Sequence, residues 1–598
     1  MGFIFLDTIS TVVLAKTTLA VMLMDLSSAN SREYQQQAID AEIKLLEESI
    51  RALKYRRNAL APISSLPTEV TTLIFSFLRA TSSAFTPDKK PDPGHLARLR
   101  VTHVCQQWRE IALNQPLFWS HINFTNLSSA GVTEILARAK TAPLYLEARF
   151  LGRQWDDALF SRFYAFQETL QACVSHICHL CFSADISQLL ETLKGLISPA
   201  PTLERLSLRC VTTSRSEYEV IPETLFGGIT PRLSCLELRE CGISWKSQLF
   251  RGLKCLNIHS TPLYPSIEDW VDALDDMPQL KMLTLQGASP MANDGAPYDV
   301  KRTATLPSLT HFHISESPME CSFALAHLDL PALTCLSVQI SFEPWNAVDV
   351  EDVFPYIAQH SHGSQDTQPL QSVLIRGKQT HVDIFAWPLP NIDVEVQGST
   401  LLTETVPPRV ALSLWSDEWD VIDTPNEILG MAMRAVPLDG LVTLIIQDFL
   451  TPPFKQSWLP NLPKFPLLRH LRLAPNVATR FIAWLRSDDW GREDPLLPSL
   501  KELVVVDAHL YEKWTLRLCG ALMKRVEQGV PLEMLDLRTC RPDPGYPVAG
   551  RLLGEIVVDV WGPEETLDAR AQIISRWDLS ASAACGSFVR HDNLDYKL

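Results

Sequence analysis

Positive charge is scarce in this 598-residue chain: 53 Lys and Arg residues face 69 Asp and Glu residues, which leaves a formal net charge of −16 at pH 7. Such a balance gives no general attraction to phosphate, and the densest basic group is only Lys54, Arg56 and Arg57. We therefore expect no nucleic-acid partner. Hydrophobic residues make up 46% of the chain, which excludes intrinsic disorder of the whole, and the length predicts several domains or one long repeat array.

Cysteine is sparse as well, because 13 residues spread over the whole length cannot form a disulfide framework. The densest group is Cys173-x-x-His176-x-Cys178-His179-x-Cys181. No second Cys pair follows to complete a tetrahedral zinc site, and alternation along a strand would send these side chains to opposite faces. Of the two interpretations, zinc binding and a buried strand rich in cysteine, we expect the second, with no metal and no cofactor.

Recognisable catalytic motifs are missing from the sequence. It contains no glycine-rich phosphate loop, no Gly-x-Ser-x-Gly turn and no His-Glu-x-x-His pair. The 15 histidines and the many carboxylates form no convincing catalytic pair by their spacing. We therefore predict that the chain is not an enzyme.

Residues 1–30 form an apolar leader that is interrupted by Asp7 and Lys16. A membrane-spanning helix needs about 20 predominantly apolar residues, and a signal peptide begins with a basic region that is missing here. A translation start at Met22 or Met24 is another interpretation of this segment. We expect a cytoplasmic or nuclear protein that is neither secreted nor attached to a membrane.

Residues 33–60 carry apolar side chains at alternating spacings of four and three, which is a heptad seam. The seam residues are Ile39, Ile43, Leu46, Ile50, Leu53, Arg57 and Leu60. This pattern predicts an amphipathic helix. Because the seam covers barely three heptads and includes Arg57, two interpretations stay open: the helix pairs with a second copy as a coiled coil, or it packs on its own domain.

A small all-α module is predicted at residues 62–122. Pro67 suits a first helical position and Glu69 suits the positive end of the helix dipole. Apolar residues then follow at helical spacing, namely Val70, Leu73, Ile74, Phe77 and Leu78. After an insertion rich in Pro, Ser and Thr at residues 79–94, a second helical pattern runs from Leu96 toward Pro116.

This module resembles an F-box-like domain, and the long insertion makes it similar to the variants of mushroom-type fungi. The matching text is Leu66-Pro67-x-Glu69-Val70, Ile74-Phe75-x-x-Leu78, Val101-x-x-Val104-Cys105-x-x-Trp108-Arg109-x-Ile111-Ala112 and Pro116-Leu117-x-Trp119. The resemblance implies binding to the Skp-type adaptor of a cullin-RING ubiquitin ligase, with apolar side chains docked against partner helices. The implied adaptor-binding residues are Leu66, Pro67, Val70, Ile74, Leu78, Val104, Trp108, Pro116 and Trp119. Sequence alone does not divide them between the interface and the module's own core.

Residues 140–560 repeat a Leu-x-x-Leu-x-Leu pattern. The copies begin at Leu203, Leu233, Leu253, Leu280, Leu309, Leu333, Leu370, Leu441, Leu468, Leu500 and Leu532. The array resembles an irregular leucine-rich-repeat solenoid, an α/β fold in which each unit adds one strand to a parallel concave sheet. We predict two degenerate strands, at residues 392–396 and 410–414, in the longest gap. Residues 561–598 are predicted to be a C-terminal cap or tail.

Strand alternation places the odd positions of each copy on the concave face of the predicted sheet. Five of these residues are arginines: Arg209, Arg239, Arg376, Arg472 and Arg538. Because arginine clusters bind carboxylate and phosphate, one hypothesis is that this face binds an acidic or phosphorylated segment of a substrate protein. The other interpretation is that scattered arginines only keep the sheet face soluble.

These patterns together predict a substrate-recognition adaptor, which binds a Skp-type adaptor through residues 62–122 and a target protein of unknown identity through the repeats. It would recruit that target for ubiquitination. The alternative is a leucine-rich-repeat scaffold with no link to a ubiquitin ligase, either free or attached to a membrane.

Overall fold

A computed structural model describes residues 32–80, 99–125, 127–151, 156–211, 220–291, 302–343, 348–361, 368–377, 381–390, 395–397, 400–402, 406–416, 425–447, 465–486, 497–537 and 540–542. The apolar leader at 1–30, most of the insertion at 79–94 and the C-terminal segment at 561–598 lie outside these residues. The chain divides into two compact units, Met1–Tyr145 and Leu146–Leu598.

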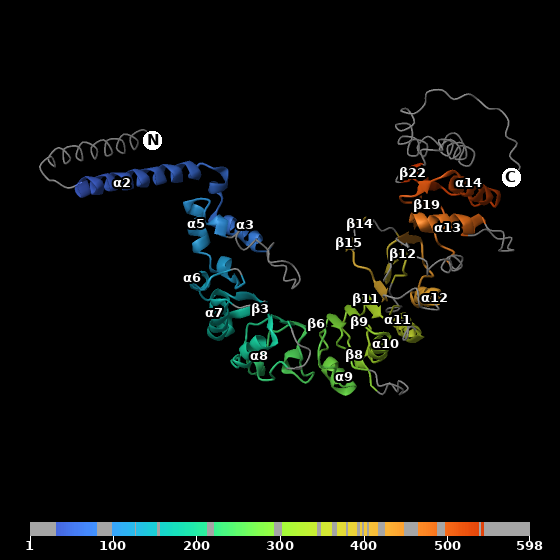
Figure 1. Cartoon of the computed structure of the whole chain (residues 1–598), viewed down its shortest axis with the longest axis horizontal. Helices are drawn as coiled ribbons and strands as arrows, with labels where there is room; N and C mark the ends of the chain where they lie inside the picture. The colour runs from blue at the N-terminus through green and yellow to red at the C-terminus, as the bar shows by residue number, and fades with distance from the viewer. Residues whose placement is uncertain are drawn as a thin grey trace, which may run out of the picture. The chain divides into compact units, whose positions relative to one another are not determined.

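The first unit is mainly helical (Figure 1). Its elements are α2 (Arg32–Ala59), the short 3-10 helix η2 (Pro62–Ser65), α3 (Thr68–Ala80), α5 (Gln106–Leu113), the 3-10 helix η3 (Pro116–Trp119), β1 (His121–Asn123) and α6 (Ser129–Ala139). Residues 99–101 are also helical. Apolar spacing, Pro at the start of η2 and η3, and Ser128 as the N-cap of α6 account for these bounds.

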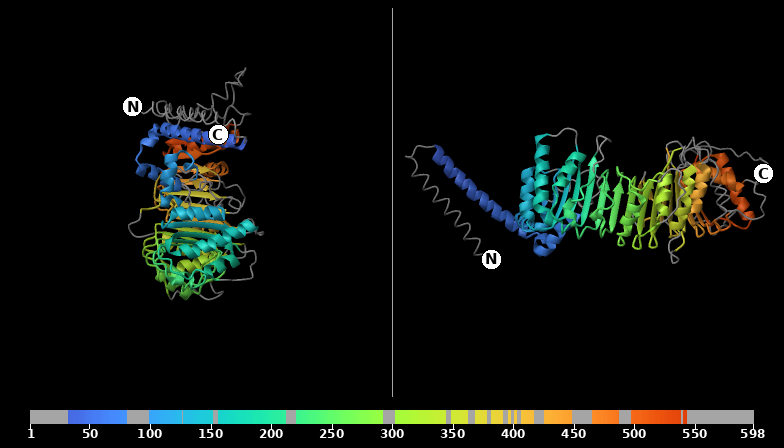
Figure 2. Two further views of the ribbon diagram at one scale, coloured as in Figure 1. Left: turned by 90° about the vertical axis from the view of Figure 1, so that its left-hand side faces the viewer. Right: turned by 90° about the horizontal axis from the view of Figure 1, so that it is seen from below.

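The second unit is built on a large, mostly parallel sheet, whose strands lie side by side in Figure 2. In spatial order these strands are β2 (Leu144–Phe150), β3 (Ile177–Asp185), β4 (Arg205–Val211), β5 (Cys235–Arg239), β6 (Cys255–His259), β7 (Met282–Gln286), β9 (His311–Glu316), β11 (Cys335–Ser341), β16 (Val410–Trp415), β13 (His381–Trp387), β12 (Ser372–Gly377), β17 (Thr443–Gln447), β18 (His470–Leu473), β19 (Glu502–Val505) and β21 (Met534–Asp536). Together with the helical first unit, this sheet makes the molecule a mixed α/β structure.

Helices stand between some of the strands along the chain of the second unit. They are α7 (Asp157–Cys173), α8 (Ile186–Lys194), α9 (Ile267–Asp275), α10 (Pro318–Ala326), α11 (Phe354–Ser361), α12 (Pro425–Ala435), α13 (Pro475–Arg486) and α14 (Glu512–Glu527). Figure 1 shows α8, α9 and α10 on one side of the sheet. Within the described ranges, three two-stranded pairs lie outside the main sheet: β8 (Ala304–Thr305) with β10 (Leu328–Asp329), β14 (Glu395–Gln397) with β15 (Thr400–Leu402), and β20 (His509–Leu510) with β22 (Arg541–Pro542).

The leucine pattern of the sequence explains both the strands and the core. From β4 to β11, the second apolar residue of each copy is in register with that of the next, so that Leu206 lies opposite Leu236, and Leu236 opposite Leu256. These side chains are fully buried, and the residues between them face the other way. Each strand therefore has an apolar side, which faces the helices and forms the core, and a more polar side. We call the polar side of β4 to β11 the open face.

The strands of the main sheet follow the order of the chain except at β16, β13 and β12, which stand in reverse order. Strands were predicted at residues 392–396 and 410–414, in the sequence gap between the copies at Leu370 and Leu441, and the second of them is present as β16. They do not lie between those two copies in the sheet. Instead β12 and β17, which carry those copies, pair directly with each other. β16 pairs with β11, and β13, which we did not predict, lies antiparallel between β16 and β12. Part of the 392–396 segment forms β14, outside the main sheet.

None of the helices in the described ranges is long and apolar enough to cross a membrane.

Candidate functional site

The start of α3 is set by Leu66 and Pro67, which follow η2 in extended conformation. The amide of Thr71 donates to the carbonyl of Pro67 at 3.1 Å, which is the first bond of the helix. Pro67 therefore lies at the capping position, one residue before the first helical position predicted for it. Leu66 is half-buried and Pro67 is exposed.

The inward side of α3 is carried by Phe75, which is fully buried. Its ring meets that of Trp108 edge-on at 5.2 Å between centroids, and that of Phe118 at 5.8 Å. Trp108 is half-buried on α5, whose N-cap is the Cys105 side chain, 3.5 Å from the Trp108 amide. Aromatic packing on Phe75 thus joins α3, α5 and η3 into one small core.

Trp119 also belongs to this core, with only 3% of its surface exposed. Its indole N–H donates to the carbonyl of Ala112 at 2.8 Å, and the guanidinium of Arg138 lies 4.5 Å from its ring. A side chain held in this way does not offer a docking surface in the described structure. Its assignment as an adaptor contact is therefore corrected to a core role, since η3 turns the ring inward onto α5 and α6.

The outward side of α3 carries four large apolar residues, which we call the α3 strip: Val70, Leu73, Ile74 and Phe77. Their exposed fractions range from 36% to 63%. Val104, in the turn before α5, is 57% exposed. Of the other predicted contacts, Pro116 is half-buried, and the side chain of Leu78 lies outside the described residues. The motif match missed Leu73 and Phe77, although their helical spacing marked them.

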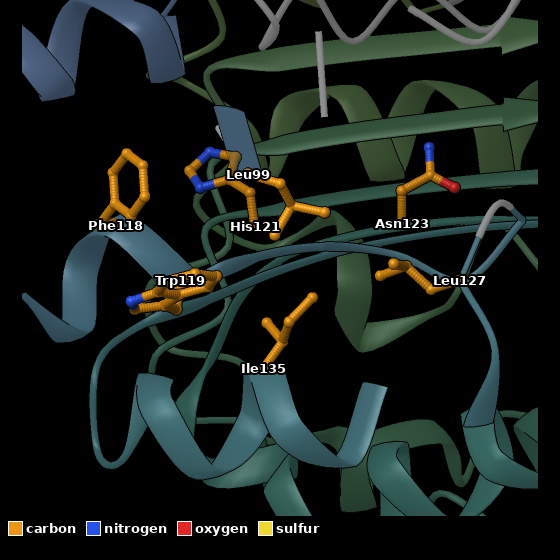
Figure 3. Close-up of a pocket in the computed structure, with 7 residues that line it drawn as sticks. All are labelled: Leu99, Phe118, Trp119, His121, Asn123, Leu127 and Ile135. Carbon is orange, nitrogen blue, oxygen red and sulfur yellow. The ribbon is translucent and has the colours of Figure 1, made fainter. Parts of the chain in front are cut away.

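A small pocket lies beside the Phe118 and Trp119 turn (Figure 3). It is lined by Leu99, Phe118, Trp119, His121, Asn123, Leu127 and Ile135. His121 stacks on Tyr145 with ring centroids 4.1 Å apart. The lining residues are mostly apolar, and His121 and Asn123 are the polar ones.

On the open face of the sheet, Arg209 and Arg239 are direct neighbours in register on β4 and β5. The Nε of Arg239 is 2.9 Å from Glu237, whose other carboxylate oxygen lies 3.3 Å from the Ser207 hydroxyl. The Glu237 carboxylate thus offsets the positive charge of Arg239, one of the two arginines of this pair.

Arg376 lies in the same register row as Arg239, but it is not on an open surface. Asp383 of β13 faces it at 2.6 and 3.1 Å, and both side chains are only 6% exposed. Ser413 donates to the second oxygen of Asp383 at 2.7 Å. Its assignment as a substrate-binding residue is therefore corrected to a buried ion pair, because the unpredicted strand β13 brings a carboxylate beside it.

The structure does not place the remaining predicted arginines, Arg472 and Arg538, beside Arg209 and Arg239. Arg472 is half-buried and lies beside Ile445 in the adjoining register row. Arg538 lies outside the described residues. Near β12 this side of the sheet is also covered, since Leu374, Trp387 and Ile445 form a buried apolar cluster there. The candidate target surface is thus confined to the open face.

The Cys and His group is spread over the end of α7, the 3-10 helix η4 (Val174–His176) and β3. Register with β4 puts His179 and Cys181 on one side of β3, so Cys178 points to the other. Burial raises the pKa of the Cys181 thiol to about 11. Among the described residues no three potential ligands are grouped closely enough to hold a metal ion.

Comparison with known families agrees with the geometry of the first unit. Residues 63–125 match the F-box-like family, and this part of the chain is an F-box-like domain. F-box-like domains generally bind Skp-type adaptors in SCF ubiquitin ligase complexes, which indicates an adaptor role. No curated protein shows significant similarity to the chain.

Proposed function

We propose that the chain is the substrate-recognition subunit of an SCF-type ubiquitin ligase. The α3 strip and Val104, with Leu66 and Pro67, dock on a Skp-type adaptor, and the open face binds the target protein. The observation that carries the proposal is the division of α3 into two sides, one packed on the domain core through Phe75 and one exposed through the α3 strip.

The energetics of the α3 strip support docking. Full burial of a large aliphatic or aromatic side chain contributes about 1.5–3 kcal/mol relative to exposure. Four such side chains on one helix side therefore supply enough hydrophobic contact for helix-in-groove recognition. Phe75 and Trp119 would hold the strip in place without contacting the partner.

The second unit supports a target-binding role. We interpret it as an irregular leucine-rich-repeat solenoid, because leucines recur in register along parallel strands and helices lie on one side. Arg209 and Arg239, which are register partners on adjacent strands, suit an acidic or phosphorylated segment. The chain itself performs no catalysis in this proposal and acts by bringing the target close to the ligase machinery.

Adaptor binding can be tested with purified full-length chain and a Skp-type adaptor. Leu73→Glu combined with Val104→Glu should abolish co-purification, because both side chains are exposed and neither supports the core. The matched control is Leu45→Glu, which places the same charge at an exposed position of α2. A wild-type chain that does not bind the adaptor would refute the ligase role, and a double variant that still binds would refute the assigned surface.

Target binding needs a separate test, with arrays of acidic peptides in phosphorylated and unphosphorylated form. Arg209→Glu combined with Arg239→Glu should reduce peptide binding at least tenfold. Arg251→Glu, on an exposed turn between β5 and β6, serves as the control. Equal binding by the double variant and the wild type would remove the arginine pair from the target surface.

A further inference from the structure

α2 exposes an apolar seam that nothing in the described part of the chain covers. Ile39, Ile43, Leu46, Ile50 and Leu53 are each between 44% and 59% exposed. The helix is 28 residues long and regular throughout. Of the two interpretations open at the sequence level, packing on its own domain is not what the described residues show. The seam is therefore a surface with room for an occupant.

The seam has the composition of a helix pair. With Ile43 at heptad position a, the a positions hold Ile43 and Ile50, and the d positions hold Leu46 and Leu53. Apolar Ile and Leu at these positions form the seam through which the helices of a coiled coil pack on each other. The partner that fits this seam is a helix with the same heptad repeat, and α2 of a second copy of the chain is such a helix.

The first half of α2 is acidic and the second half is basic, and this division determines whether two paired helices run parallel or antiparallel. Residues 40–48 contain four acids and one lysine, whereas residues 51–57 contain four basic residues and no acid. Two copies running in opposite directions place each acidic half beside a basic half. Two parallel copies place like charges together, which is unfavourable at the e and g positions that flank the seam.

The register follows from the heptad. When Ile43 packs opposite Leu53 of the second copy, Leu46 packs opposite Ile50 of that copy. The flanking pairs are then Asp40 with Lys54 of the second copy and Glu42 with Arg56 of the second copy, each formed twice by symmetry. One like-charged pair remains, Glu47 with Glu47 of the second copy, beside the two-fold axis. In a parallel pair, Glu42 would instead approach Glu47 of the second copy, and the two Arg57 side chains would face each other within the seam.

We propose that α2 forms an antiparallel homodimer with α2 of a second copy of this chain. The two-fold axis passes near residue 48, so the two helix ends that lead into the F-box-like domains lie roughly 36 Å apart along the axis, at 1.5 Å per residue. The proposal rests on the seam and charges of α2 alone and stands whether or not the F-box-like domain binds its adaptor.

The mass of the full-length chain in solution tests the dimer. Sedimentation velocity should give twice the chain mass of 67.2 kDa at micromolar concentration. A monomer overturns the proposal, whether α2 stays bare or another segment of the same chain covers its seam.

Charge reversal tests the direction. Glu42→Arg or Arg56→Glu alone should weaken the dimer at least tenfold, because each creates like-charged pairs at both ends. The double variant should restore the dimer, and a mixture of the two single variants should form a heterodimer. Glu48→Arg, on the outward side of the helix, is the control. A parallel dimer would be strengthened by Glu42→Arg, and a dimer indifferent to all these changes uses another surface; either result overturns the proposal.

Cross-linking tests the register. Ser49 lies opposite Ser49 of the second copy only in the antiparallel arrangement. Ser49→Cys should therefore give a covalent dimer with a short bifunctional thiol reagent, whereas Glu48→Cys and the wild type, with its native cysteines, should not. Failure of Ser49→Cys to cross-link in a sample that sediments as a dimer would overturn the antiparallel register.

Discussion

The two units of the molecule use the same kind of apolar pattern in opposite ways. In the sheet, the repeated leucines of β4 to β7 are buried and the residues between them face outward. In α2 and α3, the apolar stripe is the exposed side. Half of the exposed large apolar side chains in the described part of the chain lie within residues 32–125.

The difference teaches that periodicity shows where an apolar side is, but not what covers it. A strand of the sheet has helices of its own chain on its apolar side, because every repeat brings strand and connection together. α2 has no such layer among the described residues, and α3 has one only on the side of Phe75. Apolar helix sides that remain exposed in the folded chain are candidates for surfaces that bind a partner.

The comparison is tested most strongly by two phenylalanines on α3. Phe75→Ala should lower the free energy of unfolding of the first unit by about 3–5 kcal/mol, because it leaves a cavity between Trp108 and Phe118. Phe77→Ala should cost less than about 1 kcal/mol, because the side chain is largely exposed. Urea denaturation followed by tryptophan fluorescence measures both. Equal losses would show that α3 does not have separate core and surface sides.

A second test concerns the buried ion pair of the sheet. Asp383→Asn should cost about 3–5 kcal/mol in the second unit, because it leaves the Arg376 guanidinium buried without a compensating charge. Replacing both residues together, as Arg376→Met with Asp383→Leu, should recover most of that loss. Chemical denaturation measures the effect. If Asp383→Asn leaves the free energy of unfolding unchanged, the Arg376 guanidinium is accessible to solvent and not buried.

A third test compares the units directly through leucine. Leu256→Ala, in the centre of β6, should cost about 2–5 kcal/mol because the side chain is fully buried. Leu46→Ala, on the seam of α2, should leave the unfolding of the dilute monomer nearly unchanged and should weaken the dimer. Denaturation at low concentration and sedimentation at high concentration separate these effects. A large loss for the Leu46 variant in the monomer would mean that α2 packs on its own chain.

The smallest expected effect is a pH dependence in the second unit. Burial lowers the pKa of His360, whose Nε2 lies 3.1 Å from the Leu325 carbonyl. The unfolded chain therefore takes up a proton at higher pH than the folded chain. The contribution of His360 to the free energy of unfolding should be fully present above the ordinary His pKa of about 6.5. It should be lost as the pH falls from there toward the lowered pKa of the folded state. His360→Gln should make this fall shallower in denaturation between pH 7.5 and 5.5, whereas His103→Gln, at an exposed position, should not.

Much of the architecture could be predicted from sequence, because the signals were local. The F-box-like match rests on residues that set helix starts and aromatic packing, such as Pro67 and Trp108. The leucines at 206, 236 and 256 marked strands and their buried side correctly, since a period of two fixes which way each side chain points. The parallel direction of the strands was implied by the resemblance to leucine-rich repeats.

The sequence-based predictions were wrong where contacts between residues far apart in the sequence determine burial. Trp119 and the α3 strip have similar hydrophobicity, and only the tertiary position of α5 and α6 separates a core residue from a surface residue. Arg376 followed the strand pattern correctly, but its carboxylate partner sits on β13, a strand without the leucine signature. No local signal in residues 372–415 specifies that the block enters the sheet in reverse order.

That reversed block has a consequence for how the second unit folds. In a sheet stacked in chain order, each strand adds to its predecessor, and assembly can spread step by step from any point. Here β16 reaches β11 only across the sequence that forms β12 and β13, so a long loop must close before β11 and β17 are joined by a continuous sheet. We therefore expect β2 to β11 and β17 to β21 to gain protection from hydrogen exchange early and independently. The junction at β16, β13 and β12 should be the last part to form.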